Sequence, residues 1–341
     1  MTARIERLRE SLEEPLLVTN PTNIFYLFGF KSSNAALLVE PDRVRLFSDF
    51  RYSEAARAVE GVEFEETERD LLKDLSGRLS GRIGFEADFV TYSGYETIRA
   101  GSVEPVPREG LVEGLRAVKD EGELASIKWA CEIADRVFER LADERFVGRT
   151  EREVAWRIEQ LFHAEGGEAL AFETIVASGP NAARPHGRAT DRQIGRGETV
   201  IVDAGCTVEG YSSDYTRTFT TGGVDGVIED AYAVVLAAQQ AGFDALRAGV
   251  TGIDADAAAR RVVDDTPFAG TFGHGLGLDV HEAPRLSTES TDTLSPGNVV
   301  TVEPGIYLEG RAGIRIEDNV VITEHGIENF TGLRKDLITV D

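Results

Sequence analysis

Four acidic residues of this chain lie where apolar side chains would normally be buried. Asp203 follows the apolar run TVIV, and Glu303 follows NVVTV. Asp214 lies in the strand-like segment YSSDYTRTF, and Glu317 lies inside AGIRIEDNVVI. Because a buried carboxylate without a partner costs several kcal/mol, each of these acids must be paired or must bind a cation.

Histidine is scarce, and three of the five histidines lie beside glycine or proline in turn-like segments. They are His186 in RPHG, His274 in FGHGLG and His281 in DVHEAP. With His274 the four acids form an oxygen-rich set of five ligands, which suits divalent Mn, Co, Fe or Zn better than a closed structural zinc site. A hairpin would bring Asp203 and Asp214 face to face. Four carboxylates balance two dications, so the pattern favours a two-metal centre.

Each of these residues also has an explanation that needs no metal. Asp203 could cap a turn. Glu303, which precedes a proline, could be a solvated residue at a sheet edge, and His274 could be a turn residue. Asp214 and Glu317 could form ion pairs with Arg217 and Arg315, which would leave no metal site. All of these alternatives would have to occur together to remove the site.

The elements that would position these residues form an α+β pattern from about residue 116 to residue 341. An apolar stripe predicts a helix from Asp120 to Leu141, and a capping box at Thr150 and Glu153 begins a second helix. Two more helices are expected over about 229–248 and 254–263. The strands expected between and after them are FETIVAS, TVIVDAG, YSSDYTRTF, NVVTVEPGIY and AGIRIEDNVVI. Two groups of helices, each followed by strands, predict helices on a largely antiparallel sheet.

The first third alternates strand-like and helical segments. LLVTN, AALLVE, VRLFSD and GRIGFE are strand-like, whereas RYSEAARAVE, ERDLLKDLSGRL and VTYSGYETIRA have helical spacing. The N-terminal MTARIERLRESLEEP predicts a short charged helix. A smaller α/β domain is therefore expected over residues 1–115, with a linker around Pro105 to Lys119. It has neither G-x-G-x-x-G nor G-K-[ST], so it is a poor candidate for a nucleotide-binding domain.

The composition excludes several classes of protein. A formal charge of −24 argues against nucleic-acid binding, which needs concentrated Lys and Arg. No apolar run approaches the roughly 20 residues that cross a bilayer, and the N-terminus lacks the apolar core of a secretion signal, so a cytoplasmic location is expected. Cys131 and Cys206 form no C-x-x-C pair and no disulfide framework. The H-E-x-x-H and G-x-S-x-G signatures of other hydrolases are missing.

Four segments resemble the metal-binding motifs of the creatinase/prolidase family of M24-type metallopeptidases. They are VDAGCTVEGYSSDYTRTF, FGHGLGLDVHEAP, VVTVEPGIY and GIRIEDNVVI. More loosely, NPTNIFYLFGF and IGFE resemble the family's N-terminal domain. The resemblance implies an α+β pita-bread catalytic domain over residues 116–341, preceded by the smaller creatinase-like α/β domain. It also implies a homodimer and an Xaa-Pro dipeptidase or Xaa-Pro aminopeptidase.

Carried over to this chain, the resemblance implies two divalent metal ions per subunit, with Mn favoured among Mn, Co, Fe and Zn. Asp203 would bind one ion through both oxygens, Asp214 and Glu317 would bridge the ions, and His274 and Glu303 would complete the shell.

The resemblance also implies roles for residues around the metals. His186 and His281 correspond to the family's active-site histidines outside the metal shell, although the first could be a loop histidine and the second could pack near Glu282. Arg315 would support the ligands, its alternative being a surface ion pair. A metal-bridging hydroxide would attack, with Glu303 relaying the proton and His281 stabilising the oxyanion. Expected substrates are peptides with proline second, whose scissile nitrogen has no hydrogen.

Three other functions fit the same fold. They are a methionine aminopeptidase, a metal-free creatinase-like amidinohydrolase and a non-catalytic pita-bread binding module. The first usually lacks an α/β domain in front, and the other two are expected to lose metal ligands. Because all five ligand positions are kept, a peptidase that cleaves before proline is the expected function.

Overall fold

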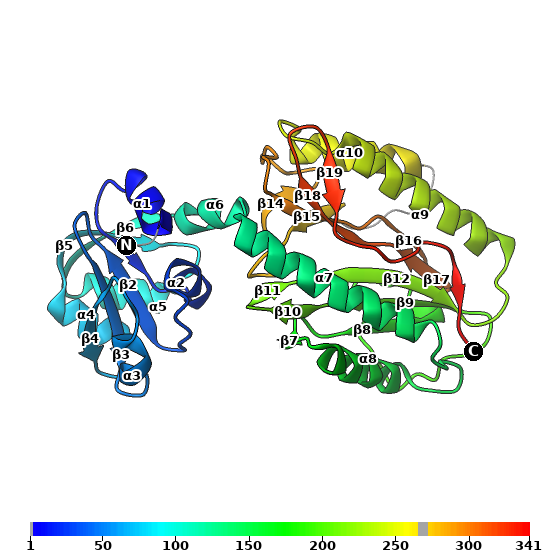
Figure 1. Cartoon of the computed structure of the whole chain (residues 1–341), viewed down its shortest axis with the longest axis horizontal. Helices are drawn as coiled ribbons and strands as arrows, with labels where there is room; N and C mark the ends of the chain where they lie inside the picture. The colour runs from blue at the N-terminus through cyan, green and yellow to red at the C-terminus, as the bar shows by residue number, and fades with distance from the viewer. Residues whose placement is uncertain (1–2, 265–271) are drawn as a thin grey trace. The chain divides into compact units, whose positions relative to one another are not determined.

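The computed structural model of the chain, shown in Figure 1, describes residues 3–264 and 272–341. It divides into two compact units, Met1–Arg116 and Ala117–Asp341. The segment expected to be a linker contains the end of strand β6 (Ser102–Arg108) and helix α6 (Leu111–Ala117). Within the described residues, no helix is both long enough and apolar enough to span a bilayer.

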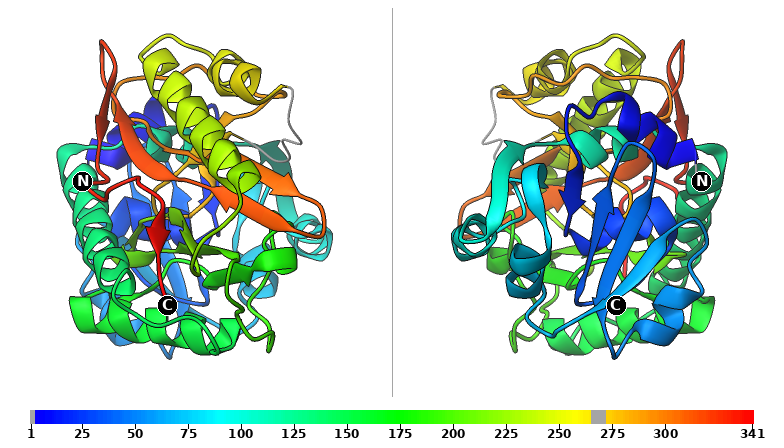
Figure 2. Two further views of the ribbon diagram at one scale, coloured as in Figure 1. Left: turned by 90° about the vertical axis from the view of Figure 1, so that its right-hand side faces the viewer. Right: turned by 90° about the vertical axis from the view of Figure 1, so that its left-hand side faces the viewer.

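The first unit is built on a six-stranded sheet of order β4-β3-β2-β1-β5-β6. Strand β2 runs antiparallel to both of its neighbours, and the other pairings are parallel. The right-hand view of Figure 2 shows this sheet with its helices. The α/β architecture expected for this part of the chain is confirmed. Its further elements are α1 (Ala3–Glu10), β1 (Leu16–Val18), α2 (Pro21–Phe28), β2 (Ala35–Val39), β3 (Val44–Asp49), α3 (Ser53–Arg57), β4 (Glu63–Thr67), α4 (Leu71–Arg78), β5 (Ser80–Glu86) and α5 (Tyr92–Arg99).

The second unit begins with two helices that are closed by side-chain caps. Asp120 and Glu123 form a capping box at the start of α7 (Glu121–Leu141), and Thr150 and Glu153 form the predicted one at α8 (Glu151–Glu165). Each cap satisfies backbone N–H groups that the helix leaves without partners. Further along, the described residues form the short 3₁₀ helix η1 (Gly179–Asn181) and the α-helices α9 (Gly226–Ala245) and α10 (Gly252–Val263).

In the described part of the second unit, the strands form four small sheets, ordered β20-β12-β9-β8, β14-β13-β15-β18-β19, β11-β10-β7 and β16-β17. Of the described pairings, the β12–β20 pair is parallel and the others are antiparallel, so the expected largely antiparallel arrangement is confirmed. The strands are β7 (Ala169–Leu170), β8 (Ile175–Ser178), β9 (Thr199–Ala204), β10 (Cys206–Val208), β11 (Tyr211–Ser212), β12 (Tyr215–Thr220), β13 (Gly273–Gly275), β14 (Glu282–Leu286), β15 (Val299–Val302), β16 (Gly305–Leu308), β17 (Ala312–Arg315), β18 (Asp318–Ile322), β19 (Ile327–Asn329) and β20 (Ile338–Thr339).

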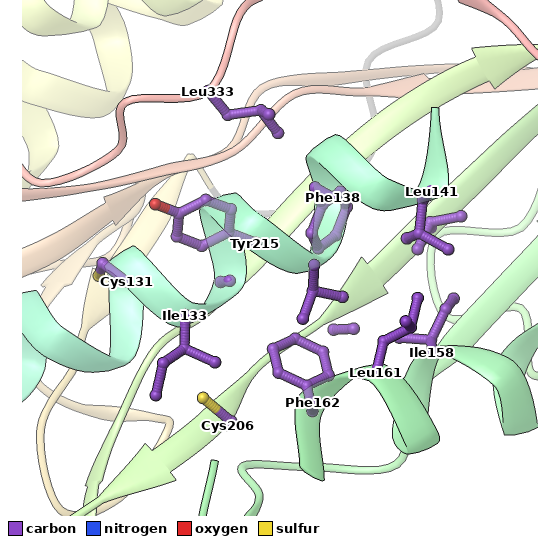
Figure 3. Packing of buried hydrophobic residues seen from close by; sticks show 14 of the residues in the cluster. Cys131, Ile133, Phe138, Leu141, Ile158, Leu161, Phe162, Cys206, Tyr215 and Leu333 are labelled. Atoms are coloured by element: carbon purple, nitrogen blue, oxygen red, sulfur yellow. The ribbon is translucent and has the colours of Figure 1, made fainter. Parts of the chain in front are cut away.

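Two hydrophobic clusters join these helices to the strands. In the first, α7 and α8 pack on β9 and β12; Figure 3 shows Phe138 of α7 beside Tyr215 of β12, with Phe162 of α8 in the same cluster. Cys131 and Cys206 lie in this cluster, buried and free. In the second cluster, α9 and α10 pack on β15 and β18, and the left-hand view of Figure 2 shows these helices over the strands. Each cluster gives the adjoining strands a rigid support.

Three segments expected to be single strands are interrupted at an acidic residue. Asp214 lies between β11 and β12, Glu303 lies between β15 and β16, and Glu317 lies between β17 and β18. The prediction that Asp214 and Glu317 lie within strands was therefore wrong. A break lets the carboxylate leave the regular alternation of a pleated strand, in which successive side chains point to opposite faces.

Candidate metal centre

Asp203 and Asp214 are brought together by antiparallel pairing, as the sequence predicted. Strand β9 pairs with β12 so that Asp203 lies opposite Thr216, two residues beyond Asp214. Gly205 permits the close approach of the two segments, because a Cβ atom there would lie 1.8 Å from the carbonyl oxygen of Ser213. Gly210, further along the same segment, lies in a tight turn.

That turn is a two-residue loop between β10 and β11. Val208 pairs with Tyr211, and the intervening Glu209 and Gly210 have positive φ angles of 51° and 84°. Positive φ at both central residues is the type I′ geometry that matches the twist of a hairpin. The turn fixes where the chain re-enters the sheet and thus the position of Asp214.

His274 is oriented by its own backbone and by a neighbouring strand. Its N–H donates to Thr301 Oγ1 at 3.1 Å, and its Nδ1 lies 3.1 Å from the carbonyl oxygen of Gly275. The Nε2 atom lies 3.6 Å from Asp214 Oδ2 and 3.4 Å from Glu303 Oε1. When Nδ1 carries the proton and donates it to the carbonyl, Nε2 presents a lone pair to the carboxylates, as a metal-binding imidazole requires.

The structure brings all five predicted ligand residues into one region. Single ligand atoms of Asp214, His274 and Glu317 lie within 4.8 Å of one another, close enough to share an ion. Glu303 adjoins His274, and Asp203 lies diagonally across the β9–β12 pair from Asp214. The arrangement is deeply buried, since Asp214 is 5% exposed and Glu317 is 1% exposed.

Burial raises the pKa values of the four acids, and in most of them the clustering of like charges adds to the rise. Burial raises the pKa of Asp214 and of Glu317 well above the usual carboxyl range, and the neighbouring carboxylates raise both further. Burial also raises the pKa of Asp203, although Arg315 opposes the shift. Burial raises the pKa of Glu303 to about 7. The four acids therefore resist ionising together unless a positive charge joins them.

Two oxygen atoms of the cluster show that the residues fit a metal ion. Asp203 Oδ1 and Glu317 Oε1 are buried and have no hydrogen-bond partner among the described residues. A buried acceptor without a partner costs about 1–3 kcal/mol, and more when it is charged. Carboxylate oxygens with one imidazole are ligands that Mn, Co, Fe and Zn accept.

Arg315 lies inside the site, so the alternative that it forms a surface ion pair was wrong. Its Nη2 donates to Asp203 Oδ2 at 2.5 Å, and its Nε donates to Thr216 Oγ1 at 3.0 Å. Its Nη1 donates to the hydroxyl of Tyr307 at 2.9 Å and to the carbonyl of Pro185 at 2.8 Å. One side chain thus holds the carboxylate of Asp203 and the loop that precedes His186.

The alternative in which arginines neutralise Asp214 and Glu317 does not occur. Arg217 pairs with Asp318 at 2.8 Å and Arg315 pairs with Asp203, so among the described residues neither arginine forms an ion pair with Asp214 or Glu317.

Sequence reasoning missed three residues that hold the ligands. Thr216 Oγ1 donates to Glu317 Oε2 at 2.7 Å, and Asn319 Nδ2 donates to the carbonyl of Asp214 at 2.6 Å. Tyr307 is the third, through Arg315. Thr216 and Asn319 each lie two residues after a predicted ligand, and this closeness in the sequence could have identified them.

His281 and His186 lie at the exposed side of the cluster. The His281 ring packs edge-on against His274, with ring centroids 4.3 Å apart. Partial burial lowers the pKa of His281, and the charges of His274 and His186 lower it further. Glu282 is engaged by Lys119 at 2.7 Å, with both side chains almost fully buried. The segment that carries His281 is thereby anchored to the chain just before α7.

Comparison with known families agrees with this geometry. Residues 125–324 match the model of Metallopeptidase family M24, and residues 4–118 match the Creatinase/Prolidase N-terminal domain. The chain belongs to the M24 metallopeptidase family. The Xaa-Pro dipeptidase of Pyrococcus furiosus is 32% identical over 354 residues, which cover 99% of this chain and 100% of that relative.

Solved structures of similar proteins cover both domains of this chain. The Xaa-Pro dipeptidase from Bacillus anthracis has a TM-score of 0.94 and 36% identity, covering 99% of both chains. The X-Pro aminopeptidase from Thermotoga maritima has a TM-score of 0.89 and 35% identity, covering 99% of this chain and 100% of that one. The chain is thus a metallopeptidase with a creatinase N-terminal α/β domain and a pita-bread catalytic domain, as expected, and its family implies a divalent metal.

Proposed function

We propose that this chain is an exopeptidase that holds two divalent ions and hydrolyses the peptide bond between a first residue and a proline. The observation that carries the proposal is the pair of unpartnered, buried oxygens on Asp203 and Glu317 within a cluster of four carboxylates and one imidazole. The names of the similar proteins support the substrate class.

The charge of the cluster supports two ions over one. Arg315 contributes the single positive charge that contacts the four carboxylates among the described residues, through Asp203. The four carboxylates and Arg315 sum to a charge of −3, so one dication would leave −1 and two would leave +1, which an attacking hydroxide would neutralise. One ion would be held by Asp214, His274, Glu303 and Glu317. The other ion would be held by Asp203 together with Asp214 and Glu317, which both ions would share.

The residues around the cluster support a hydrolytic mechanism. Bound divalent ions would supply Lewis acidity for the scissile carbonyl and for an attacking water. Glu303 has a side chain that is 17% exposed, against 12% for Asp203 and 7% for Asp214, so it can reach both water and substrate. It would accept a proton from the water and deliver it to the leaving proline nitrogen.

The two outer histidines would bind the peptide. Because the pKa of His281 is lowered, its imidazole is neutral near pH 7 and can donate one N–H to the carbonyl oxygen as negative charge develops. His186, in the loop held by Arg315, would orient the substrate. The scissile nitrogen of an Xaa-Pro bond carries no hydrogen, so a site without an acceptor at that point favours proline.

Peptide hydrolysis after metal exchange tests the proposal. Protein stripped with a chelator and reloaded with Mn, Co, Fe or Zn should cleave Ala-Pro, Ala-Pro-Ala or both, and should leave Ala-Ala intact. Similarity to the Thermotoga enzyme favours the second candidate, an aminopeptidase that cleaves the tripeptide. Cleavage of the dipeptide alone would favour a dipeptidase. A reloaded protein that cuts Ala-Ala as fast as the proline peptides would refute the proposed specificity.

A matched pair of aspartate variants tests the metal assignment. Asp214→Asn should lose bound metal and hydrolysis together, because it removes a carboxylate shared by both ions. Asp244→Asn is the control, since Asp244 is exposed on α9. Full hydrolysis by metal-depleted Asp214→Asn would rule out the mechanism.

A further inference from the structure

A buried polar network lies behind the strand breaks that carry the candidate ligands. Gln239 of α9 accepts a hydrogen bond from Lys335 Nζ at 2.7 Å through its Oε1 atom. Lys335 Nζ also lies 2.5 Å from Asp318 Oδ2, and Asp318 Oδ1 accepts from Arg217 Nη2 at 2.8 Å. Gln239, Asp318 and Arg217 are each at most 2% exposed. The mechanism above uses none of these four side chains.

The amide of Gln239 contacts the main chain immediately before two of the ligands. Its Nε2 donates to the carbonyl of Val302 at 3.1 Å and to the carbonyl of Ile316 at 3.3 Å. These residues precede Glu303 and Glu317, where the strands stop. A buried carbonyl needs a donor, and at a strand end the neighbouring ladder is interrupted. A side chain from the helix supplies that donor to both segments at once.

Lys335 determines which way the amide of Gln239 faces. A lysine ammonium can donate but cannot accept, so the amide oxygen must point toward Lys335. The NH₂ group must then point toward the two carbonyls. The orientation of Gln239 is therefore set by Lys335, and Lys335 is held by Asp318.

Arg217 acts on the same segment from the other side. Its Nη1 donates to the carbonyl of Glu317 at 2.7 Å and to the carbonyl of Thr216 at 2.9 Å. The hydroxyl of Thr216 in turn donates to Glu317 Oε2. The main chain on both sides of the Ile316–Glu317 peptide bond is thus fixed by buried side chains.

We propose that Gln239 is a positioning residue for the metal centre, which sets the directions of Glu303 and Glu317 by holding the peptide groups before them. The inference rests on the proposed metal site. Metal ligands must be held within about 0.5 Å of their working geometry, and residues behind the ligands provide that precision. Because one amide bridges both segments, it fixes the spacing between the two glutamates.

Cobalt binding by glutamine variants tests this proposal. In Gln239→Leu both donors are lost, and we expect Co²⁺ affinity to fall by about 10- to 100-fold, measured by competition with a chelator. The visible absorption spectrum of the Co²⁺ protein should also change, since it reports ligand geometry independently of hydrolysis. The matched control is Gln240→Leu, the next residue on α9, which is exposed and bonds to Asp244. That control should keep both the affinity and the spectrum.

A second variant separates positioning from simple packing. Gln239→Glu keeps an acceptor for Lys335 but turns a carboxylate toward the carbonyls, so it should lose affinity as Gln239→Leu does. If Gln239→Leu fails to fold, Gln239→Glu and Lys335→Met carry the test, with unfolding in EDTA as the measure of the metal-free fold. Folded variants at position 239 that bind Co²⁺ with wild-type affinity and spectrum would overturn the proposal.

The outcome is distinguishable from failure of the proposed function. A wild-type protein that binds Co²⁺ but does not cleave Xaa-Pro peptides would refute the substrate assignment, and the cobalt measurements would still decide the role of Gln239. A wild-type protein that binds no Co²⁺ would overturn both.

Discussion

Replacing Glu303 by Gln should have opposite effects on stability with and without metal. In the metal-free protein, burial raises the pKa of Glu303 from 4.5 to about 7. The folded state therefore keeps a proton that the unfolded state releases, and the associated stability is present below pH 4.5 and is lost as the pH rises through 7. This shift corresponds to on the order of 3 kcal/mol at pH 8. Glutamine is neutral throughout and avoids that loss.

The assay is urea unfolding of both proteins in EDTA at pH 5 and pH 8. The difference in unfolding free energy should be small at pH 5, and Glu303→Gln should be more stable by on the order of 3 kcal/mol at pH 8. Glu309→Gln is the control, because Glu309 is exposed in the β16–β17 turn. It measures the gain from removing any one negative charge in a chain of net charge −24.

Added metal should reverse the order. A neutral amide is a poorer ligand for a dication than a carboxylate, so Mn or Co should stabilise the wild-type protein more than Glu303→Gln. The electrostatic reasoning would be refuted if Glu303→Gln were no more stable than Glu309→Gln at pH 8 in EDTA. Equal stabilisation of both proteins by metal would instead remove Glu303 from the ligand set.

Three further outcomes follow from contacts described above. Lys119→Met should destabilise the fold by about 3–5 kcal/mol, because it removes the ammonium group that pairs with the buried carboxylate of Glu282, and the double variant with Glu282→Leu should recover part of the loss in urea unfolding; equal losses in both would contradict this. Raising the salt concentration from 0.05 to 1 M should raise the midpoint of thermal unfolding, because it screens the acidic surface, and a falling midpoint would show that repulsion is unimportant. His281→Asn should lower kcat by about 100-fold while Co²⁺ affinity stays at the wild-type value, and a parallel loss of affinity would make the residue structural.

The candidate site was predictable because burying acids in apolar strands is costly. Asp203, Glu303 and Glu317 adjoin runs of Val and Ile, and Asp214 lies in a strand-like segment of Tyr, Thr and Phe; such a pattern persists only with a compensating charge. Long helices were also predictable from their apolar stripes. The helix expected from Asp120 to Leu141 is observed from Glu121 to Leu141.

Other features could not be predicted because they depend on distant contacts. Gln239 reads as one polar position on a helix, and its role appears only when α9 packs on the strand ends. Helix α2 was missed although Asn20 caps it and Pro21 begins it, because its apolar run NIFYLF lacks a clear polar face. The expected linker began at Pro105 and so included the second half of strand β6, which lies at a sheet edge, where proline is tolerated.

The five candidate ligands come from both hydrophobic clusters of the catalytic domain. Asp203 and Asp214 adjoin residues packed with α7 and α8, Glu303 and Glu317 adjoin residues packed with α9 and α10, and His274 lies between Phe272 of the second cluster and Leu276 of the first. Metal bound at this place would add a cross-link between two halves that also meet through buried contacts, such as the Arg217–Asp318 ion pair and the packing of Val299 in the first cluster. Removal of the metal by a chelator should therefore loosen the contact between the two halves, while each half keeps its own hydrophobic core. Amide hydrogen exchange should speed up first at the strand ends beside the four acids.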